Sequence, residues 1–261
     1  MNSFVYDSER GVFPLEAVYQ AIHEDPYWET LRVNGIRLVP GYGQPDPKRC
    51  KVMIVGEAPG ATENAKGRPF CGPSGRVLNM LMAAAGLRLD DEQPRRDEEG
   101  YIAEYGEPAN AFVTNVVKYR PPGNRTPTLY DIMHSKGDPQ FLGYGRGPAK
   151  PVEGGKQEAL RLQAAGSLRA EWRALGGPKV IVCVGGVAHS AMSPVGSELG
   201  VTAAAGNAFP ARSPDAVVHT GYWVFSQLHP AYGLRKGEAV QKMMSRHWAD
   251  MGEFLQEEGI L

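Results

Sequence analysis

The 261-residue sequence contains little cysteine: only Cys50, Cys71 and Cys183, with no CxxC pair among them. So few scattered cysteines argue against a disulfide framework, a zinc or other metal site and a four-cysteine iron–sulfur cluster. The sequence also has no apolar run approaching the roughly 20 residues of a membrane span, and its N-terminus has no basic-then-apolar leader. We therefore expect a soluble, cytoplasmic protein that makes no membrane contact.

A large excess of charge of either sign is also missing. The 28 Lys and Arg and the 29 Asp and Glu give a formal net charge of -1, so the overall charge offers no reason to expect nucleic-acid binding. The charges are segregated along the chain, however, because residues 88–110 are acidic and the strip from Lys118 to Lys156 is basic. A local basic strip favours salt-sensitive contact with a few phosphates.

Four short β-branched runs are apolar without clean alternation, which is typical of strands covered on both faces of a parallel sheet. They lie at residues 51–55, 111–116, 179–184 and 222–227. Apolar residues recur at helical spacing over 78–85, 160–175 and 238–255. The alternation predicts an α/β fold, a three-layer α/β/α sandwich with a central, mainly parallel four-stranded sheet. We expect a single domain over residues 1–261, with a Pro- and Gly-rich insertion at about 126–156.

Side chains with useful chemistry follow three of these strands. Glu57 comes directly after the first, within GEAPGATENAKGRPFCGPSG (56–75), a glycine-rich loop that also presents Phe70. This loop has neither the GK[ST] of a Walker loop nor GxGxxG spacing. Asn115 lies near the end of the second strand, and His229 follows the fourth. Because the carboxyl ends of parallel strands meet at one edge of a sheet, a carboxylate, an amide and an imidazole are predicted to meet beside one aromatic ring.

Three segments, GEAPG…GRPFCGPSG, TNVVKYRPPGNR and HPAYGLR, resemble the signature segments of the uracil-DNA glycosylase superfamily. The resemblance is closest to its family 4, thermophile-type branch, and covers about residues 38–125 and 156–250 in the family's order. It implies a uracil-DNA glycosylase-like fold. It also implies a DNA repair enzyme that flips uracil out of DNA and hydrolyses its N-glycosidic bond to leave an abasic site.

The resemblance implies how the base would be bound. Phe70 would stack on the flipped-out uracil, and Asn115 would read its polar edge with an amide that both donates and accepts. Gly56 and Ala58 would complete the substrate-binding pocket, although Ala58 stands where the best-known branch has a water-activating aspartate. The alternative for Asn115 is a hydrogen bond to backbone at a strand end, and the resemblance favours the binding role over it.

Catalysis would then rest on Glu57 and His229. His229 would hydrogen-bond the uracil O2 and stabilise the negative charge on the departing base, and Glu57 would steady an oxocarbenium-like sugar or orient water. The alternative for Glu57 is a turn carboxylate that caps nearby N–H groups, which we favour less than a role in the pocket. An apolar wedge must fill the gap left by the base, and cations must contact phosphate. The DNA-binding residues implied are Lys118, Arg120, Arg125, Tyr232, Leu234 and Arg235.

One departure from the family concerns its cofactor. The family 4 branch carries four cysteines that bind a [4Fe–4S] cluster, one of them directly after NVVK, where this chain has Tyr119. With only three cysteines in total, the sequence predicts that the cluster is absent and that no cofactor is needed. The Pro- and Gly-rich insertion would replace it as a structural prop.

Two alternative functions stay open at this point. The chain is also consistent with a glycosylase for another modified or deaminated base, in which only the shape of the pocket would differ. The second alternative is a non-catalytic DNA-binding relative, although the joint presence of Glu57, Phe70, Asn115 and His229 speaks against decay of the site. In the favoured reading the partner is uracil-containing DNA and the protein is a monomer.

Overall fold

The computed structural model describes residues 15–87, 95–96, 102–104, 108, 110–121, 167–196, 198–212 and 221–261. The expected insertion at about 126–156 and the candidate residue Arg125 therefore lie outside the described residues. Within the described ranges, no helix is both long enough and apolar enough to cross a membrane.

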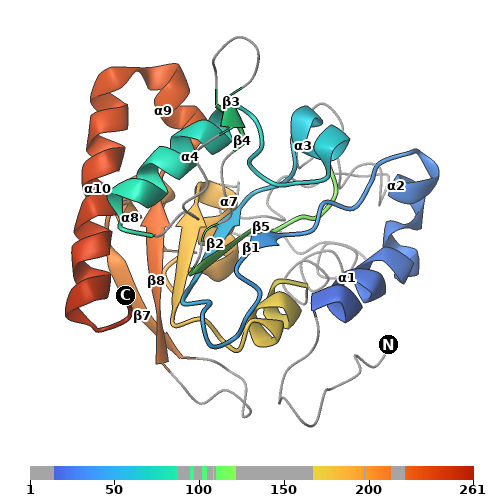
Figure 1. The fold of residues 1–261 in the computed structure, drawn as a ribbon, viewed down its shortest axis with the longest axis horizontal. Helices are drawn as coiled ribbons and strands as arrows, with labels where there is room; N and C mark the ends of the chain where they lie inside the picture. Colours follow the sequence, from blue (N-terminus) through green and yellow to red (C-terminus); the bar gives the residue numbers. More distant parts are fainter. Residues whose placement is uncertain are drawn as a thin grey trace.

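A six-stranded sheet in the order β1-β5-β2-β6-β8-β7 forms the centre of the structure (Figure 1). Its four inner strands are mutually parallel and match the four runs expected from the sequence. Every residue of β5, β2 and β6 is buried, which explains why the sequences of these three strands lack polar alternation. The predicted α/β fold is confirmed. The inner strands are β5 (Ala111–Asn115), β2 (Val52–Gly56), β6 (Val180–Val184) and β8 (Gly221–Gln227).

The sheet is wider than the four strands expected, because an antiparallel strand is added at each edge. β1 (Tyr42–Gly43) pairs with β5, and β7 (Ala208–Arg212) pairs with β8. Neither edge strand has a clear sequence signal. β1 has only two residues. β7 contains Pro210, which an edge tolerates because one side of an edge strand needs no N–H donor.

Helices surround the sheet in the described ranges. They are α1 (Leu15–Glu24), the 3-10 turn η1 (Pro26–Trp28), α2 (Glu29–Val33), α3 (Ala61–Lys66), α4 (Pro73–Ala84), α7 (Gly186–Met192), α8 (Val201–Ala204), α9 (Pro230–Lys236) and α10 (Glu238–Glu257). A further helix covers residues 167–174. A separate hairpin pairs β3 (Arg95–Arg96) with β4 (Ile102–Glu104).

Alternate side chains of the inner strands face opposite sides of the sheet and build a core on each. In β2, Val52 and Ile54 join a core with residues of α4 and α10. Met53 and Val55 join the other core, with residues of α1, α7 and the helix over 167–174. Figure 1 shows α4 and α10 on one side of the sheet and α1 on the other. The expected three-layer arrangement is therefore confirmed.

Candidate active site

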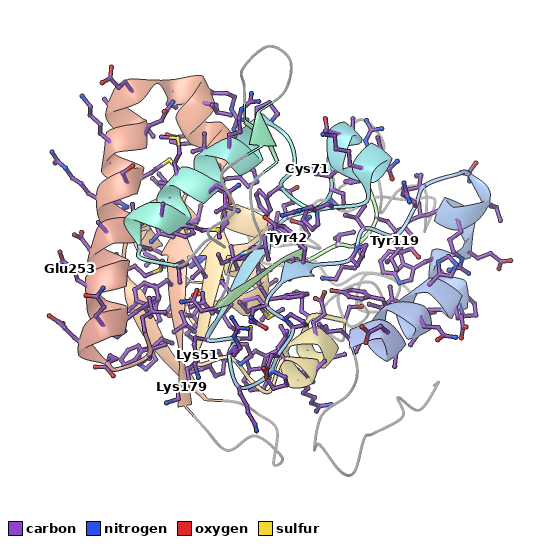
Figure 2. The ribbon with its side chains drawn as sticks, in the orientation of Figure 1. Tyr42, Lys51, Cys71, Tyr119, Lys179 and Glu253 are labelled. Carbon is purple, nitrogen blue, oxygen red and sulfur yellow. The ribbon has the colours of Figure 1, made fainter. Side chains whose placement is uncertain are left out.

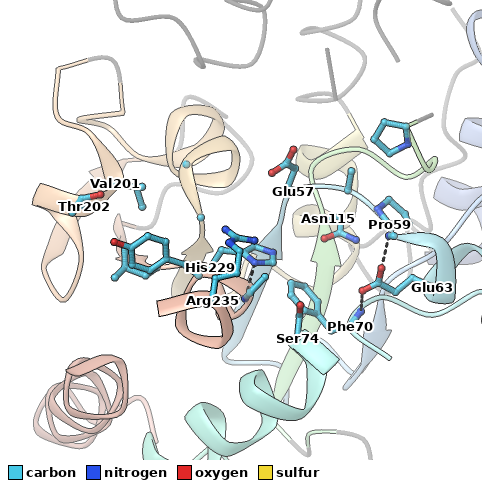
Figure 3. A pocket seen from close by; sticks show the side chains of 18 residues that line it. Glu57, Pro59, Glu63, Phe70, Ser74, Asn115, Val201, Thr202, His229 and Arg235 are labelled. Atoms are coloured by element: carbon cyan, nitrogen blue, oxygen red, sulfur yellow. Dashed lines mark hydrogen bonds between the residues drawn. The ribbon is translucent and has the colours of Figure 1, made fainter. Parts of the chain in front are cut away.

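A pocket with a volume of about 490 Å³ lies at the carboxyl ends of the inner strands (Figure 3). Each inner strand supplies a lining residue: Glu57 follows β2, Asn115 ends β5, Gly185 follows β6 and His229 follows β8. The volume falls within the range of roughly 300–1,000 Å³ that is usual for small-molecule sites. Figure 2 marks the opposite edge of the sheet, where Lys51 and Lys179 precede β2 and β6. The structure thus brings together the carboxylate, amide and imidazole that the sequence predicts at one edge.

Gly56 allows two pocket side chains to approach the backbone of β2 closely. A Cβ atom at this position would lie 2.4 Å from Oδ1 of Asn115 and 2.5 Å from Cζ of Phe70. Asn115 and Phe70 are themselves buried, with exposed fractions of 2% and 5%. The amide and the aromatic ring therefore meet over a backbone that carries no side chain, and this leaves one polar and one flat wall for a planar group.

The loop that carries Phe70 adopts an uncommon conformation. Phe70 is the one non-glycine residue with a positive φ in the described ranges, at 51°, a region that costs a bulky side chain about 1–3 kcal/mol. Its N–H donates to Oε1 of Glu63 at 3.0 Å, and Glu63 also accepts from the N–H of Gly60. A Cβ at Gly75 would lie 1.5 Å from the Phe70 carbonyl oxygen. Glu63 and Gly75 together hold the ring in place.

The orientation of His229 follows from the start of α9. His229 is the residue that precedes this helix, and its Nδ1 accepts a hydrogen bond from the Ala231 N–H at 3.2 Å. In a neutral imidazole the proton must then sit on Nε2, which leaves Nε2 as a donor. A Cβ at Gly185 would lie 3.2 Å from Cβ of His229, so the glycine lets the ring pack against the end of β6.

The environment of His229 favours its neutral form. Burial lowers the pKa of His229 from its ordinary value of 6.5, the negative charge of Glu57 opposes this, and the positive charge of Arg235 adds to it. The centre of its ring lies 5.9 Å from the centre of the Phe70 ring. Figure 3 shows His229, Phe70 and Asn115 grouped around one space. Such a site presents a flat apolar wall, an amide and a neutral N–H donor.

Of the remaining candidate residues from the sequence, some line the pocket and others lie outside its lining. Ala58, Tyr232 and Arg235 line the pocket together with Glu57, Phe70, Asn115 and His229. Leu234 lies on α9 next to this group and is 44% exposed. Arg120 is partly exposed just beyond β5. These placements bring most of the expected residues to one edge of the molecule, while their roles toward a ligand stay predictions.

Lys118 is a correction to the set of expected phosphate contacts. Its side chain is only 2% exposed, and Nζ lies 2.5 Å from Oε2 of Glu171, which is fully buried. The sequence suggested a surface cation because Lys118 begins the basic strip. The structure instead places it inside the protein as half of an ion pair, where it has no access to phosphate.

Several lining residues were missed from the sequence, among them Ser74, Pro121, Gly185 and Thr202. Glu63, which holds Phe70, lies three residues after Gly60, but glycine lacks the side-chain acceptor that makes a capping box recognisable in a sequence. Glu171 had no sequence signal, because it lies 53 residues from Lys118 along the chain.

Comparison with known proteins identifies relatives for this arrangement. A sequence model of the uracil DNA glycosylase superfamily matches residues 40–252. The chain is 40% identical over 94 residues to the type-4 uracil-DNA glycosylase of Pyrobaculum aerophilum, covering 36% of this chain and 37% of that protein. For the type-4 enzyme of Archaeoglobus fulgidus the identity is 38% over 94 residues, 36% of each chain. For that of Thermotoga maritima it is 36% over 98 residues, 38% of this chain and 40% of that protein. The chain therefore matches somewhat over a third of the length of these relatives.

The relatives contradict the expectation that no cofactor is needed, since type-4 uracil-DNA glycosylases are iron–sulfur enzymes and point to a cluster. The residues of this chain do not fit a cluster bound by four cysteines. Only three cysteines exist, and Cys50 and Cys183 are buried among apolar core side chains. No group of three His, Cys, Asp or Glu able to hold a metal occurs among the described residues. At the position after NVVK, Tyr119 is fully buried and stacks on Trp28 with ring centres 5.2 Å apart.

Proposed function

The chain belongs to the uracil DNA glycosylase superfamily, and on this premise we propose that it flips uracil out of DNA and hydrolyses its N-glycosidic bond. The product would be an abasic site and free uracil. One observation carries the proposal: Glu57, Phe70, Asn115 and His229, which come from three separate sequence segments, line a single pocket. The type-4 names of the relatives support it.

In this proposal the wall formed by Phe70 and Asn115 recognises the base. A flat pyrimidine would stack on the Phe70 ring, whose position Glu63 and Gly75 maintain. The Asn115 amide would accept from N3–H of uracil and donate to O4, whereas cytosine offers a donor in place of that acceptor. A site built to hydrogen-bond one base rejects an analogue with the wrong polar pattern, because buried polar groups are then left unpaired.

His229 would stabilise the leaving group. When the bond between C1′ and N1 breaks, its electron pair departs with the base, and the negative charge spreads onto O2. A neutral imidazole whose Nδ1 already accepts from Ala231 presents Nε2–H as the donor to that oxygen. The ring needs no reorientation during the reaction, since the start of α9 fixes it.

Glu57 would act on the sugar side. Loss of the base leaves positive charge at C1′, and a carboxylate nearby stabilises that charge and orients the attacking water. The water oxygen forms the new bond to C1′, and its proton passes to the departing uracil anion or to solvent. The negative charge of Glu57 raises the pKa of His229, so the two side chains lie within electrostatic reach of each other.

Contact with the duplex is assigned to α9. Leu234 is exposed beside the pocket, and Tyr232 and Arg235 line its rim. An apolar side chain inserted into the stack would offset the cost of unstacking, which is a few kcal/mol. A cation at the same rim suits a phosphate beside the flipped nucleotide.

The proposal is tested by measuring abasic-site formation on oligonucleotides that carry U:G, U:A, single-stranded U, hypoxanthine or 5-hydroxymethyluracil. We expect cleavage of the uracil substrates. Release of hypoxanthine or 5-hydroxymethyluracil without uracil would assign the pocket to another base. Tight DNA binding without release of any base would contradict an enzymatic function.

The lowered pKa of His229 predicts a pH dependence. The neutral ring of His229 stabilises the folded state fully above about pH 6.5. This contribution to the free energy of unfolding is lost as the pH falls through the lowered pKa of the folded state. Protonated Nδ1 also cannot accept from the Ala231 N–H. We expect single-turnover uracil release to be constant from about pH 8 to about pH 6.5 and to fall at lower pH. A rate that rises on acidification would contradict a neutral His229.

A further inference from the structure

Lys118 and Glu171 belong to a buried network that adjoins Asn115. Lys118 is 2% exposed, and Thr114 and Glu171 are fully buried. None of the three lines the pocket, so none can touch a bound base. Charged groups are seldom buried, because removing them from water costs several kcal/mol per ion. The chain nevertheless keeps an ion pair immediately behind the strand end that presents Asn115.

Each proton of the Lys118 ammonium has its own acceptor. Nζ lies 2.6 Å from Oγ1 of Thr114, 2.5 Å from Oε2 of Glu171 and 2.5 Å from the backbone carbonyl oxygen of Asn115. The third contact is the informative one, since it falls on the peptide group of the residue whose amide lines the pocket. Fixing that carbonyl fixes the peptide plane that follows Asn115, and so the backbone position from which the Asn115 side chain extends.

Glu171 anchors the ammonium to other parts of the fold. Its Oε1 accepts from Thr114 at 2.9 Å and also from the hydroxyl of Tyr19. The Tyr19 hydroxyl in turn accepts from the N–H of Gly41 at 2.8 Å. The network thus links β5, α1, the helix over 167–174 and the segment before β1. Because all its donors and acceptors are matched, it holds a single arrangement.

We propose that Lys118 is a positioning residue, which holds the Asn115 carbonyl so that the Asn115 amide faces the base. This inference rests on the proposed function, because the base is what the amide would read. Lys118 does not touch substrate, so its effect must pass through Asn115. A buried pair that served stability alone would be expected to influence excision to the same degree whether or not the Asn115 side chain is present.

Two neutral variants isolate the contact. Both carry Glu171→Gln, which removes the charge while keeping an acceptor for Tyr19 and Thr114. One adds Lys118→Gln, which keeps an N–H donor on a shorter side chain, and the other adds Lys118→Met, which matches the glutamine in length and has no donor. Neither leaves an unpaired buried charge, which is the usual reason that such variants fail to fold. Lys242→Met, which breaks the exposed 2.7 Å pair with Glu238, is the surface control.

Uracil release is measured in single turnover for both variants, each with Asn115 present and with Asn115→Ala. With Asn115 present, we expect the methionine variant to be about 10–100-fold slower than the glutamine variant in the chemical step. In the Asn115→Ala background the two should agree within about twofold. The affinity of the same four proteins is measured for an oligonucleotide containing 2′-fluoro-2′-deoxyuridine, which resists cleavage. This binding measurement gives a value even for variants whose release of uracil is too slow to follow. Circular dichroism checks that all variants fold.

An equal difference between the two variants in both backgrounds would overturn the positioning role, as would no difference in either. The proposed function fails in a different way: wild-type protein would then release no uracil from any substrate. A coupling to Asn115 seen in both rate and affinity, with Lys242→Met unchanged, would support the proposal.

Discussion

Replacing His229 by alanine is expected to slow uracil release by about 100- to 1,000-fold, which is typical when a single donor to a developing negative charge is removed. The Nε2–H of this ring is the group that we assign to the uracil O2, and alanine leaves no donor in its place. Affinity for DNA should change little, because phosphate contacts supply most of it. Single-turnover release and equilibrium binding to the same oligonucleotide separate the two quantities.

Two further variants sharpen this experiment. His23→Ala removes an exposed imidazole at the end of α1 and should leave both quantities unchanged. His229→Gln retains an amide donor and should recover part of the lost rate. Equal losses of release and binding in His229→Ala would contradict the assignment, since they would indicate a role in holding DNA or in folding.

Gly56→Ala is expected to reduce uracil release by about 100-fold, because a group displaced by about 1 Å in a site can cost that much. The new methyl carbon would lie 2.4 Å from Oδ1 of Asn115 and 2.5 Å from the Phe70 ring, well inside contact distance. Both side chains are buried and have little room to retreat. The base would lose its slot, and unfolding should become easier by about 1–3 kcal/mol from overpacking.

Gly221→Ala is the matched control for this change. It adds the same methyl group at the exposed first residue of β8, where the nearest heavy atom is the Ala211 carbonyl oxygen at 3.7 Å. Release rates and thermal unfolding are measured for both proteins. If Gly56→Ala lowered stability while leaving the release rate unchanged, the close approach would be a packing feature and not part of the base slot.

The parts of the fold that the sequence predicted are those with strong local patterns. Three of the inner strands are buried along their whole length and β8 is buried over its last four residues, so each appears in the sequence as a short apolar run. The edge strands β1 and β7 lack such a run: one has two residues, and the other contains Pro210. Both edge strands are stabilised by pairing with a neighbouring strand, and this contribution cannot be predicted from the local sequence.

The candidate site likewise contains residues that the local sequence predicted and residues that only the folded chain shows. Glu57, Asn115 and His229 follow predicted strands, so topology alone placed them at one edge. Lys118 was assigned to the surface because it begins the basic strip that runs from Lys118 to Lys156. Its partner Glu171 is distant in sequence, so the buried pair emerges only from the folded chain. The cofactor was judged by counting cysteines, and the iron–sulfur relatives contradict that inference.

Because each of the four inner strands supplies at least one lining residue at its carboxyl end or just beyond it, the pocket exists only when all four are paired. Its residues range from Glu57 to Arg235, so most of the chain must fold before any part of the site is complete. A partly folded intermediate would lack at least one wall, and a fragment ending before β8 would lack His229 altogether. Formation of the complete pocket therefore depends on native pairing of all four inner strands.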